Sequence, residues 1–266
     1  SSVLVTVYDD LVAGAIGSAQ TICYNTAPSG LTDDTSPTGG TGSYTYQWQS
    51  STDDATWNNI SGATSATYSP GDLTTSTYFR REVTSGACGT VYTSSVLVTV
   101  YDDLVAGAIG SAQTICYNTA PSGLTDDTAP TGGTGSYTYQ WQSSTDDATW
   151  SNISGATSAT YSPGNLTTST YFRREVTSWL CESKHTSSIL ITVHPDLIPG
   201  TIGSNHTICY NEDPNLLTSD FDASGGDGTY TYQWHWSEDS LTGWNNISGA
   251  TNSTYDSPAG LTEERF

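Results

Sequence analysis

The sequence predicts an all-β fold in which small β-sandwich domains follow one another along the chain. Thr, Ser, Gly and Tyr dominate the 266 residues, which include 26 Gly, 10 Pro and 17 Tyr. Aromatic and β-branched residues favour half-buried strands, while Gly, Pro, Asn and Asp favour the turns between them. Cysteines and tryptophans also recur 93 residues apart, at Cys23, Cys116 and Cys209 and at Trp48, Trp141 and Trp234. Such a period indicates tandem repeats.

Two of the repeats are almost identical. Residues 1–85 match residues 94–178 except at the pairs Ser36/Ala129, Asn58/Ser151 and Asp72/Asn165. Near-identical copies indicate a recent duplication, and they are typical of long arrays that extend a protein. The expected division is the last strand of a preceding repeat (1–8), two full repeats (9–100 and 101–193) and a truncated, divergent repeat (194–266).

Each full repeat is expected to contain about seven short strands. Residues 137–142 alternate, so that Tyr137, Tyr139 and Trp141 share one face of a strand. Short strands bounded by Gly, Pro, Asn or Ser are typical of a β-sandwich. The segments expected as strands in the second repeat are Thr114–Asn118, Ser136–Ser143, Trp150–Ile153, Ala159–Ser162, Thr170–Thr177 and Ser187–Val193.

Two short linkers join the repeats, Tyr101–Gly107 and His194–Gly200. Neither is a flexible Gly/Ser tether, and Pro195 and Pro199 stiffen the second. We therefore expect a semi-rigid string of domains. The apolar linker residues expected to pack against a neighbouring domain are Leu104, Val105, Leu197 and Ile198.

The charge and the residue types exclude several functions. A net charge of −21 repels nucleic acid and anionic lipid, and no apolar run is long enough to insert into a membrane. The first repeat has no His, and no nucleophile–base pair, metal cluster or cofactor loop is apparent. We predict no catalytic, cofactor-binding or metal residues, and therefore no enzyme.

Four motifs at fixed spacing carry a resemblance to a known family. They are Gly107–Gly110 with Gln113–Tyr117, Gly132–Gln142, Trp150–Thr157 and Thr170–Val176. Together they resemble the Ig-like (PKD-like) repeats of giant Bacteroidetes surface adhesins, many of which are associated with gliding motility and exported by type IX secretion. The resemblance covers essentially the whole chain. It implies tandem Ig-like domains, end to end, on the extracellular surface of a bacterium.

The function implied is that of a stalk or spacer segment of a secreted or cell-surface adhesin or filament. The alternative is an array of carbohydrate-binding modules on a secreted polysaccharide-degrading enzyme. Self-assembly of the repeats into a fibre wall is a third option. The expected partners are neighbouring repeats of the same chain, surface glycans and other cell-surface proteins.

In an exported chain, the cysteines predict one disulfide inside each full repeat. Cys23 and Cys88 are 65 residues apart, and Cys116 and Cys181 repeat that spacing. Cys23–Cys88 and Cys116–Cys181 are therefore the expected pairs, in preference to free thiols.

The tryptophans and the aspartate pairs can each be interpreted as structural residues or as ligand-binding residues. Trp48, Trp141 and Trp234 are expected in the core, and Trp57, Trp150 and Trp244 are interpreted as packing residues in preference to sugar platforms. Calcium is an alternative ligand for the linker aspartate pairs Asp9–Asp10 and Asp102–Asp103. Solvated turns are the expected role of these two pairs and of the further pairs Asp33–Asp34, Asp53–Asp54, Asp126–Asp127 and Asp146–Asp147. Arg80 and Arg81 should point to opposite faces of one strand, as should Arg173 and Arg174. One arginine of each pair is expected to extend its charged end to solvent or to pair with Glu82 or Glu175.

Overall fold

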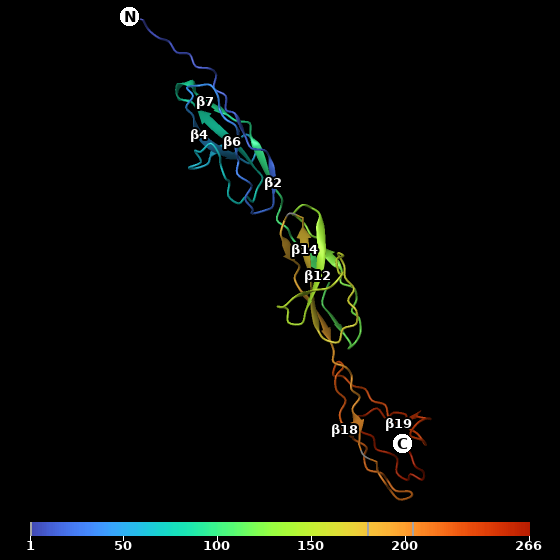
Figure 1. Ribbon diagram of the computed structural model, residues 1–266. Coiled ribbons are helices and arrows are strands. Elements are labelled where there is room, and N and C mark those ends of the chain that lie inside the picture. The colour runs from blue at the N-terminus through green and yellow to red at the C-terminus, as the bar shows by residue number, and fades with distance from the viewer. Residues whose placement is uncertain (1, 180, 204) are drawn as a thin grey trace.

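The computed structural model describes residues 2–179, 181–203 and 205–266, which form three repeats arranged end to end (Figure 1). The predicted all-β fold is confirmed, because the described residues contain strands, turns and one short 3-10 helix, Gly86–Cys88, but no α-helix. No helix in this part of the chain is long and apolar enough to cross a membrane. Below, repeat 1 comprises strands β1–β8, repeat 2 comprises β9–β16 and repeat 3 comprises β17–β20.

The larger sheet of repeat 1 has the strand order β2–β8–β6–β4–β5, with β7 also beside β6. β2 is parallel to β8, and the other pairs are antiparallel. Because β8 continues β7 along the same edge of β6, the two act as halves of one strand. The bounds are β2 (Gln20–Ile22), β4 (Thr45–Ser51), β5 (Asn58–Asn59), β6 (Thr77–Thr84), β7 (Thr90–Tyr92) and β8 (Val96–Val100).

The second layer of repeat 1 is made of shorter pieces. β1 (Ala15–Ile16) pairs with β3 (Asp33–Thr35), and single bridges join Leu31 to Tyr68 and Thr26 to Leu73. These segments cover the inner face of the larger sheet, so the repeat is a two-layer sandwich.

Repeat 2 reproduces this topology. Its larger sheet has the order β10–β16–β14–β12–β13, with β15 also paired to β14, and β9 pairs with β11 in the second layer. The bounds are β9 (Ala108–Ile109), β10 (Gln113–Ile115), β11 (Asp126–Thr128), β12 (Tyr137–Ser144), β13 (Ser151–Asn152), β14 (Thr170–Ser178), β15 (Ser183–His185) and β16 (Ile189–Val193).

Repeat 3 contains two short antiparallel pairs. β17 (Thr201–Ile202) pairs with β18 (Ser219–Phe221), and β19 (His235–Trp236) pairs with β20 (Asn245–Asn246). Its last residue, Phe266, exchanges two backbone hydrogen bonds with Ser237.

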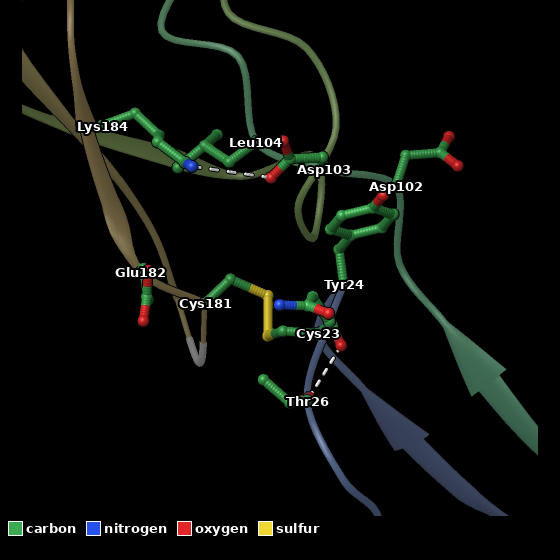
Figure 2. Close-up of a pocket in the computed structure, with 10 residues that line it drawn as sticks. Cys23, Tyr24, Thr26, Asp102, Asp103, Leu104, Cys181, Glu182 and Lys184 are labelled. Carbon is green, nitrogen blue, oxygen red and sulfur yellow. Dashed lines mark hydrogen bonds and ion pairs between the residues drawn. A yellow bond between two sulfur atoms is a disulfide. The ribbon is translucent and has the colours of Figure 1, made fainter. Parts of the chain in front are cut away.

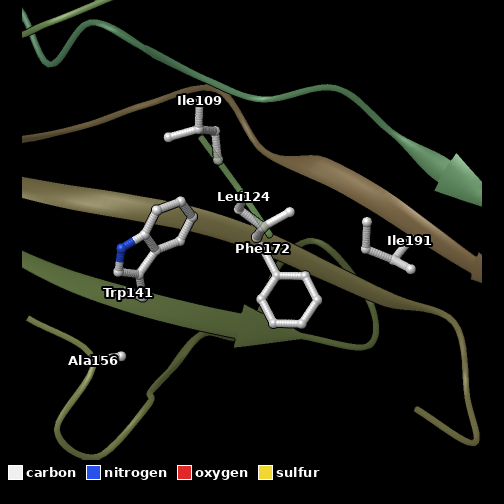
Figure 3. Close-up of a cluster of buried hydrophobic side chains, with 6 residues drawn as sticks. All are labelled: Ile109, Leu124, Trp141, Ala156, Phe172 and Ile191. Atoms are coloured by element: carbon white, nitrogen blue, oxygen red, sulfur yellow. The ribbon is translucent and has the colours of Figure 1, made fainter. Parts of the chain in front are cut away.

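A tryptophan lies at the centre of each full repeat, as predicted. Trp141 is fully buried among Ile109, Leu124, Phe172 and Ile191 (Figure 3). Its indole Nε1 donates a hydrogen bond to the Ser158 carbonyl at 2.9 Å, which satisfies the only polar atom of the ring. Repeat 1 has an equivalent core around Trp48. Each full repeat therefore has a hydrophobic core of its own.

Some of the expected strands differ from those observed. The segment Ala159–Ser162 contributes only a bridge at Tyr161, and residues 2–8 form no strand. The identical sequence in β8 is a strand because β2 and β6 flank it, whereas residues 2–8 have no neighbouring strand in this chain. Val3, Leu4 and Val5 are consequently exposed.

Candidate functional site

At the junction between repeats 1 and 2, two consecutive linker residues are hydrogen-bonded to different repeats. The Tyr101 amide donates to the Ile22 carbonyl of repeat 1 at 3.0 Å. The carbonyl of Asp102, the residue after Tyr101, accepts from the Gly133 amide of repeat 2 at 2.8 Å. The chain therefore passes from one repeat to the other within a single residue step. This geometry supports the expected semi-rigid connection.

The junction between repeats 2 and 3 is built in the same way. The His194 amide donates to the Ile115 carbonyl at 2.9 Å, and the Gly226 amide donates to the Pro195 carbonyl at 2.9 Å. A glycine precedes this contact in every repeat. Gly132 has φ +74°, and a Cβ there would lie 1.9 Å from the Asp103 carbonyl oxygen, so only glycine permits the close approach.

The apolar linker residues behave differently from the expectation. Leu104 is buried with Ala106 and Val176 in repeat 2, and it also lines the hollow that Cys23 and Tyr24 of repeat 1 share. Val105, Leu197 and Ile198 are more than half exposed. Backbone hydrogen bonds restrict the linker, and of these four side chains only Leu104 is buried at the junction.

A disulfide closes the same junction. Cys23 of repeat 1 is bonded to Cys181 of repeat 2, with 5.5 Å between their Cα atoms (Figure 2). The two residues are 158 positions apart in the sequence. The bond therefore joins two domains that the backbone already connects through Tyr101 and Asp102.

The predicted pairs Cys23–Cys88 and Cys116–Cys181 are wrong. Cys88 is a partly buried free thiol, and Cys116 is an exposed one. The reason lies in strand direction. β2 runs parallel to β8, so Cys23, just after β2, lies at the end where the chain leaves repeat 1. Cys88 follows β6, which is antiparallel to β8, and so it lies at the opposite end, where the chain enters.

The distance between these two ends prevents a bond inside the repeat. β6 alone has 8 residues, which span about 26 Å at about 3.3 Å per residue. A disulfide needs Cα atoms within about 7 Å of each other. The exit end of one repeat, however, faces the entry end of the next, where the loop cysteine lies.

A hollow of about 230 Å³ lies beside the disulfide and is lined by residues of both repeats and the linker. Lys184 Nζ and Asp103 Oδ1 face each other across it at 3.8 Å (Figure 2). Both side chains are about half exposed, so this ion pair contributes little to stability. In repeat 1 the position of Lys184 is occupied by Val91.

The described residues show no group of three or more His, Cys, Asp or Glu side chains placed to hold a metal ion. The candidate calcium pairs at the linkers have other contacts. Asp102 accepts a hydrogen bond through its backbone carbonyl, and Asp103 pairs with Lys184. The equivalent Asp9 carbonyl accepts from the Gly40 amide. These contacts give the backbone carbonyls of Asp9 and Asp102 a structural role.

The turn aspartates stabilise their own loops. The Asp53 carboxylate accepts hydrogen bonds from the Thr56 and Ala55 amides at 2.7 and 2.9 Å, and these bonds hold the pKa of Asp53 well below its ordinary value. Asp146 makes the same bonds to Thr149 and Ala148. This agrees with the interpretation of these pairs as turn residues.

The Asp33–Arg81 pair corrects a prediction. Arg81 is fully buried and its Nη1 lies 2.8 Å from Asp33 Oδ1 in the second layer, whereas Glu82 was the expected partner. The guanidinium also donates to the carbonyls of Ala66 and Ala13 at 2.7 and 3.2 Å. Arg174 and Asp126 form the same pair in repeat 2 at 2.9 Å. These arginines join the two layers of each sandwich.

The Asp33–Arg81 pair makes the stability of repeat 1 dependent on pH. Burial raises the pKa of Asp33, but the Ser36 hydroxyl and the Arg81 guanidinium outweigh this effect, and the pKa lies below its ordinary value. A lowered pKa in the folded state stabilises the fold above the unfolded pKa of about 4, and this stabilisation is lost as the pH falls through the folded value.

Asp33→Asn should therefore lower the unfolding free energy of repeat 1 by about 3 kcal/mol at pH 7, because it leaves the buried Arg81 charge without its partner. The difference from the unsubstituted chain should shrink as the pH falls below the unfolded pKa of about 4 and through the lowered pKa of folded Asp33. Urea denaturation at a series of pH values measures both effects. A difference that stays constant down to pH 2 contradicts the assignment.

On strands β6 and β14, the arginine that faces outward, Arg80 or Arg173, covers a tryptophan ring. The Arg80 guanidinium lies 4.2 Å from the ring centres of both Trp57 and Tyr92, and Arg173 lies 4.2 Å from Trp150. The prediction that neighbouring arginines face opposite ways is thus confirmed. Trp57 and Trp150 are half-buried and packed in this way, which supports their interpretation as packing residues.

The two-layer fold and the end-to-end junctions define a tandem array of immunoglobulin-like domains. A family model described as "Domain of unknown function (DUF8696)" matches residues 12–102, 105–195 and 198–266. These matches cover most of the sequence, so the chain belongs to this family and contains three consecutive copies of its domain.

No curated protein matches the sequence. Among solved structures, an E-to-A variant of titin domains I67-I69 is 13% identical, with a TM-score of 0.47 over 89% of this chain and 80% of the titin chain. The three N-terminal domains of the bacteriophage RB49 Highly Immunogenic Outer Capsid protein are 14% identical, with a TM-score of 0.35 over 94% and 84%. Sidekick-1 immunoglobulin domains 1-4 are 12% identical, with a TM-score of 0.35 over 97% and 71%. These similarities concern the fold alone.

Proposed function

We propose that this chain is a structural spacer, the stalk segment of a secreted or cell-surface bacterial adhesin or filament, which supports adhesion or gliding motility. The observation that carries the proposal is the junction. A linker bonded to both repeats and a disulfide across the same boundary hold successive domains in line. Such a junction suits a part that transmits position and tension and that has no catalytic task.

The disulfide also supports an extracellular location. Disulfides persist in oxidising compartments and are rare where thiols are kept reduced. The resemblance of the four sequence motifs to repeats of Bacteroidetes adhesins supports a bacterial cell surface. The neighbouring repeats are the first partners in this proposal, and surface glycans or other surface proteins would bind elsewhere on the parent protein.

The tryptophan environment disfavours the alternative, an array of carbohydrate-binding modules. Stacking on sugars requires open aromatic faces in a row, but guanidinium groups cover Trp57 and Trp150. Trp244, the counterpart of Trp57 and Trp150, is more exposed than they are, and the exposed Trp179 lies at a different position of its repeat, so these two do not form a repeated row. The spacer therefore remains the better supported function.

Small-angle X-ray scattering of the oxidised chain tests the spacer. A compact chain of 266 residues would have a radius of gyration of about 18 Å, whereas three repeats in line should give about twice that value. A value near that of a compact particle would contradict the proposal. Hydrolysis of a polysaccharide by the chain, or binding on a glycan array, would favour the alternative.

A further inference from the structure

Each full repeat contains both kinds of cysteine that the junctional disulfide uses, one at its exit end and one in its entry loop. Cys23 lies at the exit end of repeat 1, and Cys116 lies at the same place in repeat 2. Each of the two cysteine carbonyls accepts a 2.7 Å hydrogen bond from the hydroxyl of a threonine three residues later, Thr26 or Thr119. The chain then turns through Asn25 or Asn118, both with φ +55°. The exit ends thus have the same local structure.

The entry ends of repeats 1 and 2 also share hydrogen bonds at equivalent positions. The Cys181 amide donates to the Ser178 carbonyl at 2.8 Å, and the Cys88 amide donates to the Ser85 carbonyl at 2.9 Å. The hydroxyls of Ser85 and Ser178 in turn accept from the amides of Thr41 and Thr134. The two loop cysteines therefore share the same backbone anchor, although the loop sequences differ after Ser85 and Ser178 and only repeat 1 is assigned a 3-10 helix there, Gly86–Cys88.

We infer that the disulfide is a regular element of the junction between these repeats. Cys116 is the site that bonds the loop cysteine of the repeat following repeat 2, and Cys88 is the site that bonds the exit-end cysteine of a repeat docked before repeat 1. The partner in each case is another copy of this domain. The inference holds whether or not the array is a stalk.

The linker geometry places the partner correctly. Repeat 3 is attached to repeat 2 by the same two backbone hydrogen bonds that attach repeat 2 to repeat 1. With that attachment, the entry loop of a following repeat reaches Cys116 as the loop of repeat 2 reaches Cys23. The loop position equivalent to Cys181 in repeat 3 would come after Phe266 in this sequence.

The bond forms by thiol–disulfide exchange with an oxidised dithiol. The thiolate of one cysteine attacks the donor disulfide, and the second cysteine then displaces the donor sulfur. The two protein thiols lose two protons and two electrons, and the donor is reduced to two thiols. The thiol of Cys116 is exposed and therefore accessible to such a donor.

A longer chain tests the inference. A second copy of residues 101–193 is inserted after Val193 in the full chain, which is justified because each full repeat has its own core. The inserted copy carries Cys116→Ser, so that it adds one thiol only. It also carries Trp179→Phe as a mass tag, at a side chain that is 78% exposed.

Trypsin cuts this sequence at positions that separate the relevant cysteines. Cys23 falls in peptide 1–80, Cys116 in 82–173 and Cys181 in 175–184. In the original chain, digestion without reductant should link 1–80 to 175–184. In the longer chain, that link should persist and 82–173 should gain a link to the tagged loop peptide. A further cut at Asp102 separates Cys116 from Cys88.

The fraction of Cys116 that iodoacetamide modifies should fall about tenfold on insertion, because a disulfide sulfur is not alkylated. A matched longer chain with the inserted loop cysteine changed to Ser should restore that reactivity. Three results would overturn the inference: a link between 82–173 and the untagged 175–184, a Cys116 that stays reactive, or the absence of both expected links.

Discussion

When the oxidised chain is pulled by its two ends, its maximum extension should be about 540 Å shorter than that of the reduced chain. The Cys23–Cys181 bond connects two points that are 158 residues apart, and each residue adds about 3.4 Å when extended. Force entering at Ser1 passes from Cys23 directly to Cys181 and on to Phe266. The backbone between the two cysteines carries no load while the bond is intact.

Single-molecule force spectroscopy of the full chain measures this length. Reductant, or the single substitution Cys181→Ser, should add the missing length as the unfolding of repeats 1 and 2 becomes visible. The originally expected bonds inside each repeat would hide two separate lengths of about 220 Å, one per repeat. Equal contour lengths with and without reductant would rule out the junctional bond.

The contour length that the disulfide keeps from extending matters for a stalk. When a domain of an ordinary tandem array unfolds, the array lengthens by the contour of that domain and the distal part loses its position. With the Cys23–Cys181 disulfide intact, tension bypasses most of repeats 1 and 2, including the linker. Even a backbone cut between Tyr101 and Gly107 would leave the two repeats covalently joined through Cys23 and Cys181.

The sequence was sufficient to predict the core of each full repeat, whereas Trp234, which was also expected in a core, is only partly buried in repeat 3. The 93-residue period identified the copies, and the alternation of residues 137–142 identified both β12 and the inward position of Trp141. Shorter polar strands gave no such signal. β11 reads Asp-Asp-Thr, and β9 has 2 residues, so neither carries a hydrophobic period. Their positions follow from tertiary contacts with each other.

The cysteine pairing could not be derived from spacing. A 65-residue interval within a repeat and a 158-residue interval between repeats arise from the same periodic pattern, because 158 is the sum of 65 and 93. The direction of β2 relative to β8 decides between them. An early strand that is parallel to the last strand ends at the exit end, far from the loop that precedes the last strand.

The buried arginine had a sequence signal that local reasoning did not use. In β14, Phe172, Arg174 and Val176 alternate with outward residues and are all buried, so the period of 2 already assigned Arg174 to the inside. Its partner was missed because Asp126 is 48 residues away and belongs to the other layer. A neighbouring residue such as Glu175 points to the opposite face of the strand.

Arg174→Met should lower the unfolding free energy of repeat 2 by about 3–5 kcal/mol, because removal of one member of a buried ion pair leaves the other charge uncompensated. The change also deprives the Ala159 and Ala106 carbonyls of their donor. Hydrogen exchange measured by mass spectrometry locates the effect. Peptides containing Ser151 report on repeat 2, and those containing Asn58 report on repeat 1, since this position differs between the copies.

Arg173→Met is the matched control. It removes a charge from the next residue of the same strand, and its expected cost is about 1 kcal/mol, because Arg173 makes one cation–π contact with Trp150 and one hydrogen bond to Gln142. Adding Asp126→Asn to Arg174→Met should restore part of the lost stability, since it removes the unpaired charge. Equal costs for the two arginine substitutions, or no recovery in the double variant, would show that the buried ion pair does not join the two layers.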